Sequence, residues 1–278
     1  MKHNKKVYRF GIYALLVILL CISCLPIISM IGTSIKTSDD VLRKATLFPG
    51  LRNVYLLNYP KVWKNTAFPL NILNSSYVSV VSSLFCVILA SLAGYALSRF
   101  HSWIFTSFIA LLLILQMMPL ILILIPTFSI YKMFGLTDTL FGLIINYASG
   151  SLAFAVLMLK SFFDTIPQDI EEAATIDGCT QFQGFLKVIL PISTPGLSTV
   201  VIFVFVRAWN EYMVARILLQ SERLKTVNLG LQVFSQQFTV DWGLLSAASV
   251  IATIPTILFL VFAQKYLVQG MTAGAVKG

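Results

Sequence analysis

The sequence predicts an all-α membrane protein with six transmembrane helices. Apolar residues make up 58% of its 278 residues and charged residues only 11%, whereas a typical soluble domain carries about 25% charged residues. This chain has too few charged residues to form the polar surface of a soluble protein, but its composition is typical of a protein embedded in a lipid bilayer. A helix needs about 20 apolar residues to cross a hydrocarbon core of about 30 Å. Six segments meet this requirement, near 10–35, 70–98, 103–130, 139–163, 193–219 and 243–268.

The first span predicts the orientation of the chain. It is preceded by a basic cluster, formed by Lys2, Lys5, Lys6 and Arg9, which favours a cytoplasmic N-terminus and, with six spans, a cytoplasmic C-terminus. The total charge on each side does not decide the orientation, because the predicted external side holds at least as many basic residues as the cytoplasmic side. They include Lys36, Arg43, Lys44, Arg52, Lys61 and Lys64. The apolar run continues to Ile31 without a small-x-small site, which indicates a retained helix rather than a cleaved signal peptide.

Several function classes are disfavoured by what the chain contains. Its net charge of +9 is spread between apolar runs, with no basic stripe typical of nucleic-acid binding. It has no phosphate-binding loop, and His3 and His101 have no partners at metal-ligand spacing. We therefore expect a chain that is not an enzyme, with no cofactor or metal of its own and an energy source on another polypeptide.

The most polar stretch lies between the fourth and fifth spans, over residues 164–191. Five of the eleven acids fall in its first part, namely Asp164, Asp169, Glu171, Glu172 and Asp177. Pro167 is predicted at the first helical position and Gly178 at a left-handed helix end. Thr180 and Gln183 have the spacing of a capping box that begins a second helix. The loop is thus expected to form two short helices on the inner surface.

The composition of the first short helix suits contact with another protein. Ala173 and Ala174 leave room for a close approach, Ile170 and Ile176 offer apolar contacts, and the acids would complement a basic groove. An ordinary solvated helix at the membrane interface would have a similar composition. These residue types leave both interpretations open.

The spacing in this loop resembles a known family. Residues 172–178 read EAATIDG, nine residues follow, and residues 188–191 read VILP. This resembles the EAA loop of ABC importer permeases, whose pattern is E-A-A-x-x-x-G, nine residues, then I-x-L-P. The one departure is Val188 in place of the usual isoleucine.

Other stretches resemble the carbohydrate-importing branch, and in particular its smaller, maltose-type permease subunit. They are LTDT at 136–139, WNE at 209–211 and the C-terminal residues 264–278. The resemblance covers nearly the whole chain and implies the type I ABC importer permease fold with a cytoplasmic coupling helix. It implies three parts: 1–68, a helix and external loop; 69–268, a five-helix core with the coupling loop 164–191; and 269–278, a short cytoplasmic tail.

The resemblance also implies partners and site residues. The partners would be a second homologous permease, a cytoplasmic ATPase dimer that binds ATP and Mg, an external solute-binding protein and a carbohydrate, in the plasma membrane of a prokaryote. The residues implied to dock the ATPase are Glu172, Ala173, Ala174, Asp177, Gly178 and Pro191. In related heterodimeric importers the sugar contacts can lie mainly on the other subunit.

Arg207 and Glu211 are charged residues expected inside the fifth span, four apart and so on one helix face. Intramembrane charges usually face a cavity or a partner, which would place both, with Asn210, along the substrate pathway. A pair that tethers helices or reaches outward to the interface fits the sequence equally well.

Two other classes of membrane protein remain as alternatives. An ion-coupled transporter or channel would need ionisable relays near the midplane, and its uptake would collapse with the ion gradient but survive ATP depletion. A membrane scaffold would purify without an ATPase subunit.

Overall fold

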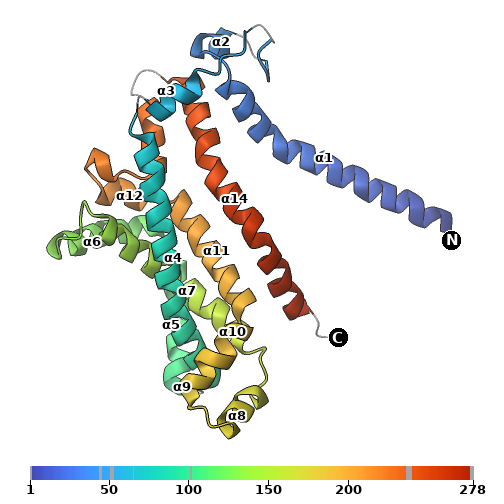
Figure 1. Ribbon diagram of the computed structural model, residues 1–278, viewed down its shortest axis with the longest axis vertical. Coiled ribbons are helices and arrows are strands. Elements are labelled where there is room, and N and C mark those ends of the chain that lie inside the picture. The colour runs from blue at the N-terminus through green and yellow to red at the C-terminus, as the bar shows by residue number, and fades with distance from the viewer. Residues whose placement is uncertain are drawn as a thin grey trace. The chain divides into compact units, whose positions relative to one another are not determined.

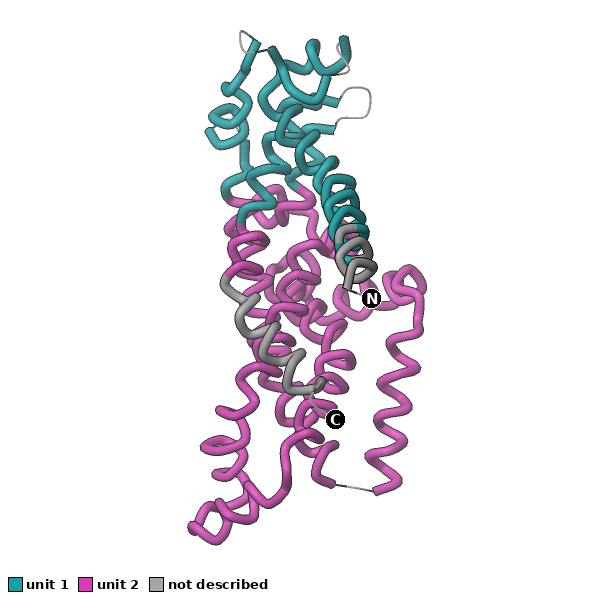
Figure 2. The backbone as a smooth tube through the Cα atoms, turned by 90° about the vertical axis from the view of Figure 1, so that its right-hand side faces the viewer, with its two compact units in different colours: residues 1–69, 230–254 teal, residues 70–229, 255–278 magenta. Residues whose placement is uncertain are grey.

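The computed structural model describes residues 2–43, 46–50, 53–64, 66–100, 102–235 and 240–275, without the side chains of 2–8, 10 and 262–275. Within these ranges the chain is almost entirely helical and forms no named strand, although Ser235 and Val240 make an isolated antiparallel bridge. It divides into two compact units, residues 1–69 with 230–254 and residues 70–229 with 255–278 (Figure 2). The three-part division implied by the resemblance concerns function and stays a prediction.

The first unit contains the N-terminal helix and the segments that follow it. Its elements are α1 (Lys2–Ser34), α2 (Ser38–Arg43), α3 (Asn58–Lys64), the short 3-10 helix Gln232–Phe234 and the start of α14 (Trp242–Ala275). The Asn58 amide donates to the backbone oxygens of Ser34 and Lys36, at 2.8 Å each, so α3 holds the end of α1. A Cβ at Gly243 would lie 2.7 Å from the Lys36 oxygen, so α14 begins with a glycine where it meets this turn.

The second unit contains the remaining helices, and α7 lies at its centre. Its longer elements are α4 (Phe68–Arg99), α5 (Trp103–Met117), α6 (Leu120–Met133), α7 (Leu140–Phe163), α8 (Asp169–Ile176), α11 (Thr194–Asn210) and α12 (Met213–Leu218). The shorter ones are α9 (Gln181–Gly184), a π-helix (Phe185–Ile189), α10 (Leu190–Ile192), a 3-10 helix (Glu222–Leu224) and α13 (Val227–Leu231). Both α5 and α11 pack against α7 (Figure 1). A Cβ at Gly94 would lie 3.1 Å from the Val156 oxygen, so a glycine lets α4 approach α7 closely.

Within the described ranges, four helices are long and apolar enough to cross a bilayer, and there are up to six candidate spans if each of two bent helix pairs counts as one. The four run over Gly11–Ser34, Phe68–Arg99, Leu140–Phe163 and Trp242–Val261. The two pairs are α5 with α6, bent by 102°, and Gln181–Ile192 with α11, bent by 75°. The first bend falls at Pro119, which lacks a backbone donor and precedes α6. Six is the number that the sequence predicts.

The fifth predicted span, 193–219, is not one helix. Its helix α11 ends at Asn210, Glu211 is extended, and α12 begins at Met213. The prediction of one continuous helix was wrong. The sequence stays apolar on both sides of Glu211, but the helix breaks there because the Glu211 carboxylate is held by Tyr147 and by the amides of Val214 and Ala215.

A turn before α7 joins the LTDT segment to the loop after α12. Asp138, in the left-handed region with a φ of 55°, accepts from the backbone amides of Gln220 and Ser221 at 2.9 Å each and from the Ser221 hydroxyl. Its own amide donates to the Leu218 oxygen at 2.7 Å. Thr139 then caps α7 by accepting from the Gly142 amide. These hydrogen bonds stabilise the charged carboxylate and so hold the pKa of Asp138 below its ordinary value. The bond from the Ser221 hydroxyl has the largest effect.

We expect Asp138→Asn to destabilise the chain by about 1 kcal/mol at pH 7, since it removes the charge from hydrogen bonds at a partly exposed site. The lowered pKa means that this stabilisation is present above the unfolded-state pKa of about 3.9 and is lost as the pH falls through the folded-state pKa. The difference in melting temperature between the two proteins, measured in detergent, should shrink as the pH falls below about 4. A difference that does not change with pH would contradict this role of the carboxylate.

Candidate functional site

The 164–191 loop forms two short helices, as predicted, at the end of unit 2 where α4 and α7 finish (Figure 1). Gly178 has a φ of +86° and ends α8, because an L residue adopts this left-handed conformation only at a cost. The capping box is present, with reciprocal bonds between Thr180 and Gln183 at 3.0 and 3.3 Å. Pro167 lies before the helix rather than at its first position, since α8 begins at Asp169.

The loop presents a mixed acidic and apolar surface. Of the residues implied to dock an ATPase, five are exposed: Glu172, Ala173, Asp177, Gly178 and Pro191. Beside them lie Ile176, which is 86% exposed, and Phe182, which is 61% exposed. The exposed acids of the loop therefore stand next to large apolar side chains that this chain does not cover.

Ala174 lies inward, in contrast to its neighbours. It is buried, and its Cβ would lie 3.9 Å from a Cβ built at Gly184. The close approach that its small side chain permits is therefore between α8 and α9 of the same loop. Its predicted part in docking an ATPase stays a prediction.

The loop is tied to the spans through Glu171. One carboxylate oxygen pairs with Arg99 Nε at 2.5 Å and the other accepts from the Tyr95 hydroxyl at 2.6 Å. The Arg99 guanidinium also donates to the backbone oxygens of Phe163 and Ile166, at 3.2 Å each. The Arg99 and Glu171 side chains are 8% and 18% exposed. We refer to this arrangement of Tyr95, Arg99 and Glu171 as the clamp.

Aromatic packing supports the clamp. The rings of Tyr95 and Phe185 are 4.6 Å apart, and Tyr95 meets Phe163 edge-on at 5.9 Å. Residues from α4, the end of α7 and the π-helix thus enclose one side of the loop. By contrast, the ion pair of Lys160 with Asp164, at 2.7 Å, is partly exposed and contributes little.

Sequence reasoning missed the clamp. The residues resembling the family pattern begin at Glu172, one position after the acid that makes the pair. A signal was present, since Tyr95 and Arg99 are four apart on the last turn of the second predicted span and so share a face. The sequence does not show which of five nearby acids would meet them.

The second candidate region contains Arg207, Asn210 and Glu211, which the structure separates. Glu211 lies beyond the end of α11, where its carboxylate accepts from the Tyr147 hydroxyl at 2.7 Å and from the amides of Val214 and Ala215. It therefore accepts hydrogen bonds from the first turn of α12 instead of sharing a helix face with Arg207, and the expectation of a shared face was wrong. The Asn210 amide donates to the Val206 oxygen of its own helix at 2.9 Å.

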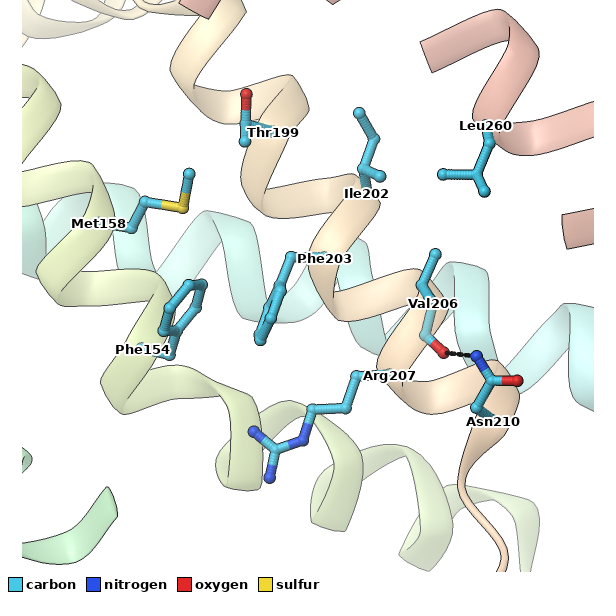
Figure 3. Close-up of a pocket in the computed structure, with 9 residues that line it drawn as sticks. All are labelled: Phe154, Met158, Thr199, Ile202, Phe203, Val206, Arg207, Asn210 and Leu260. Atoms are coloured by element: carbon cyan, nitrogen blue, oxygen red, sulfur yellow. Dashed lines mark hydrogen bonds between the residues drawn. The ribbon is translucent and has the colours of Figure 1, made fainter. Parts of the chain in front are cut away.

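Arg207 and Asn210 line a cavity of about 540 Å³ (Figure 3). The other lining residues are apolar except for Thr199; they are Phe154, Met158, Ile202, Phe203, Val206 and Leu260. The rings of Phe154 and Phe203 are stacked, with centroids 4.0 Å apart. The structure thus places two of the three predicted pathway residues at one cavity.

Comparison with known proteins gives the family. Residues 86–273 match the family described as binding-protein-dependent transport system inner membrane component. The chain is 35% identical to the inner membrane ABC transporter permease protein YcjP of Escherichia coli over the full length of both. It is 34% identical to the sulfoquinovosyl glycerol transport system permease protein SmoH of Agrobacterium fabrum, with 94% of this chain and 91% of that one covered.

A solved structure has the same fold. It is a chain of a bacterial ABC transporter involved in the import of the acidic polysaccharide alginate, with a TM-score of 0.82, 23% sequence identity, and 95% of this chain and 98% of that one covered. This confirms the predicted all-α fold of an ABC importer permease. On the match over residues 86–273, the chain belongs to the family of binding-protein-dependent transport system inner membrane components.

Proposed function

We propose that the chain is one half of a heterodimeric permease in an ATP-driven carbohydrate importer. The observation that carries this proposal is the loop 164–191, which offers an exposed acidic and apolar surface and is anchored to two spans by the clamp. The relative named for a sulfoquinovosyl glycerol transport system supports a carbohydrate as the solute. Relatives named for trehalose transport and diacetylchitobiose uptake, 34% and 31% identical to this chain, support an oligosaccharide.

In this proposal the loop takes force from a cytoplasmic ATPase dimer that binds ATP and Mg. Glu172 and Asp177 complement a basic groove on that subunit, and Ala173, Gly178 and Ile176 allow close contact. ATP-dependent motion of the ATPase then reaches α4 and α7 through the clamp. The two permease halves alternate between inward-facing and outward-facing states, whose populations are set by differential interaction with the ATP-bound ATPase.

Orientation and the other partners follow from the same assignment. The loop must face the cytoplasm to meet an ATPase, which places both termini inside and the segment 36–64 outside. An external solute-binding protein then delivers the carbohydrate to the outer mouth. The second permease subunit closes the side of the pathway that this chain leaves open.

The docking assignment is tested with Glu172→Ala. Its carboxylate is exposed and makes no hydrogen bond or ion pair within the described ranges, so we expect normal insertion, together with ATPase binding and ATP-driven uptake reduced by about tenfold or more. Gly178→Val should act similarly, since a left-handed conformation costs an L residue about 1–2 kcal/mol. The measurements are co-purification of the ATPase with a tagged chain and uptake into proteoliposomes.

A matched control is Asp39→Ala, which removes one exposed acid from α2, on the proposed external side. Its uptake and ATPase binding should stay within about twofold of the unmodified chain, as for most exposed substitutions. Normal transport and ATPase binding in both loop variants would refute the docking assignment. Uptake that collapses with an ion gradient and not with ATP depletion would refute the importer itself.

A further inference from the structure

Arg207 is a membrane-depth cation for which the proposed coupling mechanism has no use. It lies 13 residues beyond Thr194, at the start of α11, or roughly 20 Å along the helix axis, which places it in the outer half of a core of about 30 Å. Its side chain is exposed. A charged side chain at this depth is costly and normally faces a cavity or a partner.

Arg207 has no counter-charge within the described part of the chain. No ion pair or hydrogen bond of its side chain is found there. The acid nearest in sequence, Glu211, is occupied by Tyr147 and by the backbone amides that begin α12. An arginine is always protonated, so the site has a net positive charge in the chain as it stands.

The guanidinium lies where two cavities meet. In the first, it extends from α11 toward α7, on the side of the stacked rings of Phe154 and Phe203 (Figure 3), and a Cβ at Gly150 would lie 4.0 Å from one of its nitrogens. The second cavity, of about 330 Å³, lies at the bend of the third span. Its polar lining comes from Gln116, Thr127, Asn146, Ser149 and Arg207.

We infer that Arg207 binds an anionic group on the transported saccharide, such as a carboxylate, sulfonate or phosphate, at the outer half of the pathway. This inference rests on the proposed importer function. The planar guanidinium matches such groups with two parallel hydrogen bonds. The stacked rings offer a flat apolar face to a pyranose ring, and the amides and hydroxyls of the second cavity can meet its hydroxyl groups. An uncharged sugar would leave the cation without a counter-ion.

The other source of a counter-charge would be an acid on the second permease subunit. Such a pair would hold the two subunits together, and binding of the solute would then not depend on the solute's charge. The two cases differ in what Arg207→Ala changes. Loss of a solute contact weakens binding of anionic sugars only, whereas loss of a subunit contact weakens the permease dimer.

The experiment uses the whole complex, purified through a tag on this chain and placed in lipid nanodiscs. The probes are four methyl glucosides whose C6 carries a hydroxyl, a carboxylate, a sulfonate or a phosphate, and binding is followed by calorimetry. The variants are Arg207→Ala, Arg207→Lys and, as a matched loss of one charge, Arg216→Ala, whose exposed side chain lines neither cavity. Dimer recovery and ATPase activity are measured on the same samples.

We expect at least one anionic glucoside to bind more tightly than the neutral one. Arg207→Ala should weaken that binding by about 10- to 100-fold, as for a lost hydrogen bond to a charged group, and Arg207→Lys by less. Binding of the neutral glucoside and the effect of Arg216→Ala should stay within about twofold. Preferential binding of the neutral glucoside, equal binding of anions by Arg207→Ala, or loss of the permease dimer in that variant would overturn the inference. A complex that lacks an ATPase would instead overturn the importer function.

Discussion

Replacing Glu171 with alanine is expected to reduce ATP-driven uptake by about tenfold or more while the chain still inserts and assembles. The substitution leaves the Arg99 guanidinium, 8% exposed, without its carboxylate and removes the acceptor of the Tyr95 hydroxyl. Removing one partner of a buried ion pair costs about 3–5 kcal/mol, and we expect about 2 kcal/mol here because Glu171 is partly exposed. The loop then moves independently of α4, so ATP is hydrolysed without transport. Uptake and ATPase activity measured in the same proteoliposomes would show this uncoupling.

The control breaks the neighbouring exposed pair. Asp164→Ala removes the partner of Lys160, a pair with 24% and 42% exposed side chains, and should change uptake by less than about twofold because such surface pairs contribute about 0–1 kcal/mol. Glu171→Gln, which keeps one of the two acceptor oxygens but loses the charge, should be intermediate. The clamp would be refuted as a coupling element if Glu171→Ala transported normally, or if uptake and hydrolysis fell in proportion.

Gly142→Ala is expected to have a large effect on folding. The added Cβ would lie 2.1 Å from the Leu136 oxygen, far inside van der Waals contact. The turn cannot easily yield, since the Leu136 and Asp138 amides are hydrogen-bonded to Tyr131 and Leu218 at 2.8 and 2.7 Å. Overpacking a well-ordered site costs about 1–3 kcal/mol or more, so we expect a large fall in the yield of monodisperse protein and in its melting temperature.

Gly150→Ala is the matched control in the same helix. Apart from its chain neighbours and the backbone of its own helix, no atom lies closer to the added Cβ than 4.0 Å, and alanine favours a helix over glycine by about 1 kcal/mol. Its melting temperature should be equal or higher. Equal yields and melting temperatures for the two variants would show that the turn before α7 is looser than its contacts indicate.

Several features followed from local sequence alone. The apolar segments predicted the helices, because the length needed to span a bilayer and the lack of charge are properties of each segment by itself. The left-handed end at Gly178 and the capping box of Thr180 with Gln183 were confirmed, since both depend on residues within one turn of each other.

The features that failed depend on distant contacts. Arg207 and Glu211 were expected on one helix face, but the hydrogen bond of Tyr147 and the amides of the next helix draw Glu211 out of α11. The role of Ala174 at a docking surface stays a prediction, although the structure shows its side chain buried beside Gly184 of α9. The spacing of residues along the chain cannot show which side of a short helix, such as α8, is covered by the next helix.

The sequence by itself determined that the chain is embedded in a membrane, the number of its candidate spans, and the position of the 164–191 loop between the fourth and fifth of them. The tertiary structure alone decided which acid of that loop is tied to the spans, because an ion pair between residues 72 positions apart forms only where folding brings α4 and α8 together. It also decided that Arg207 has no acidic partner among the residues that the structure describes. Glu211 is only four residues from Arg207 in the sequence, but α11 ends before it. Its carboxylate instead accepts hydrogen bonds from Tyr147 and from the amides of Val214 and Ala215.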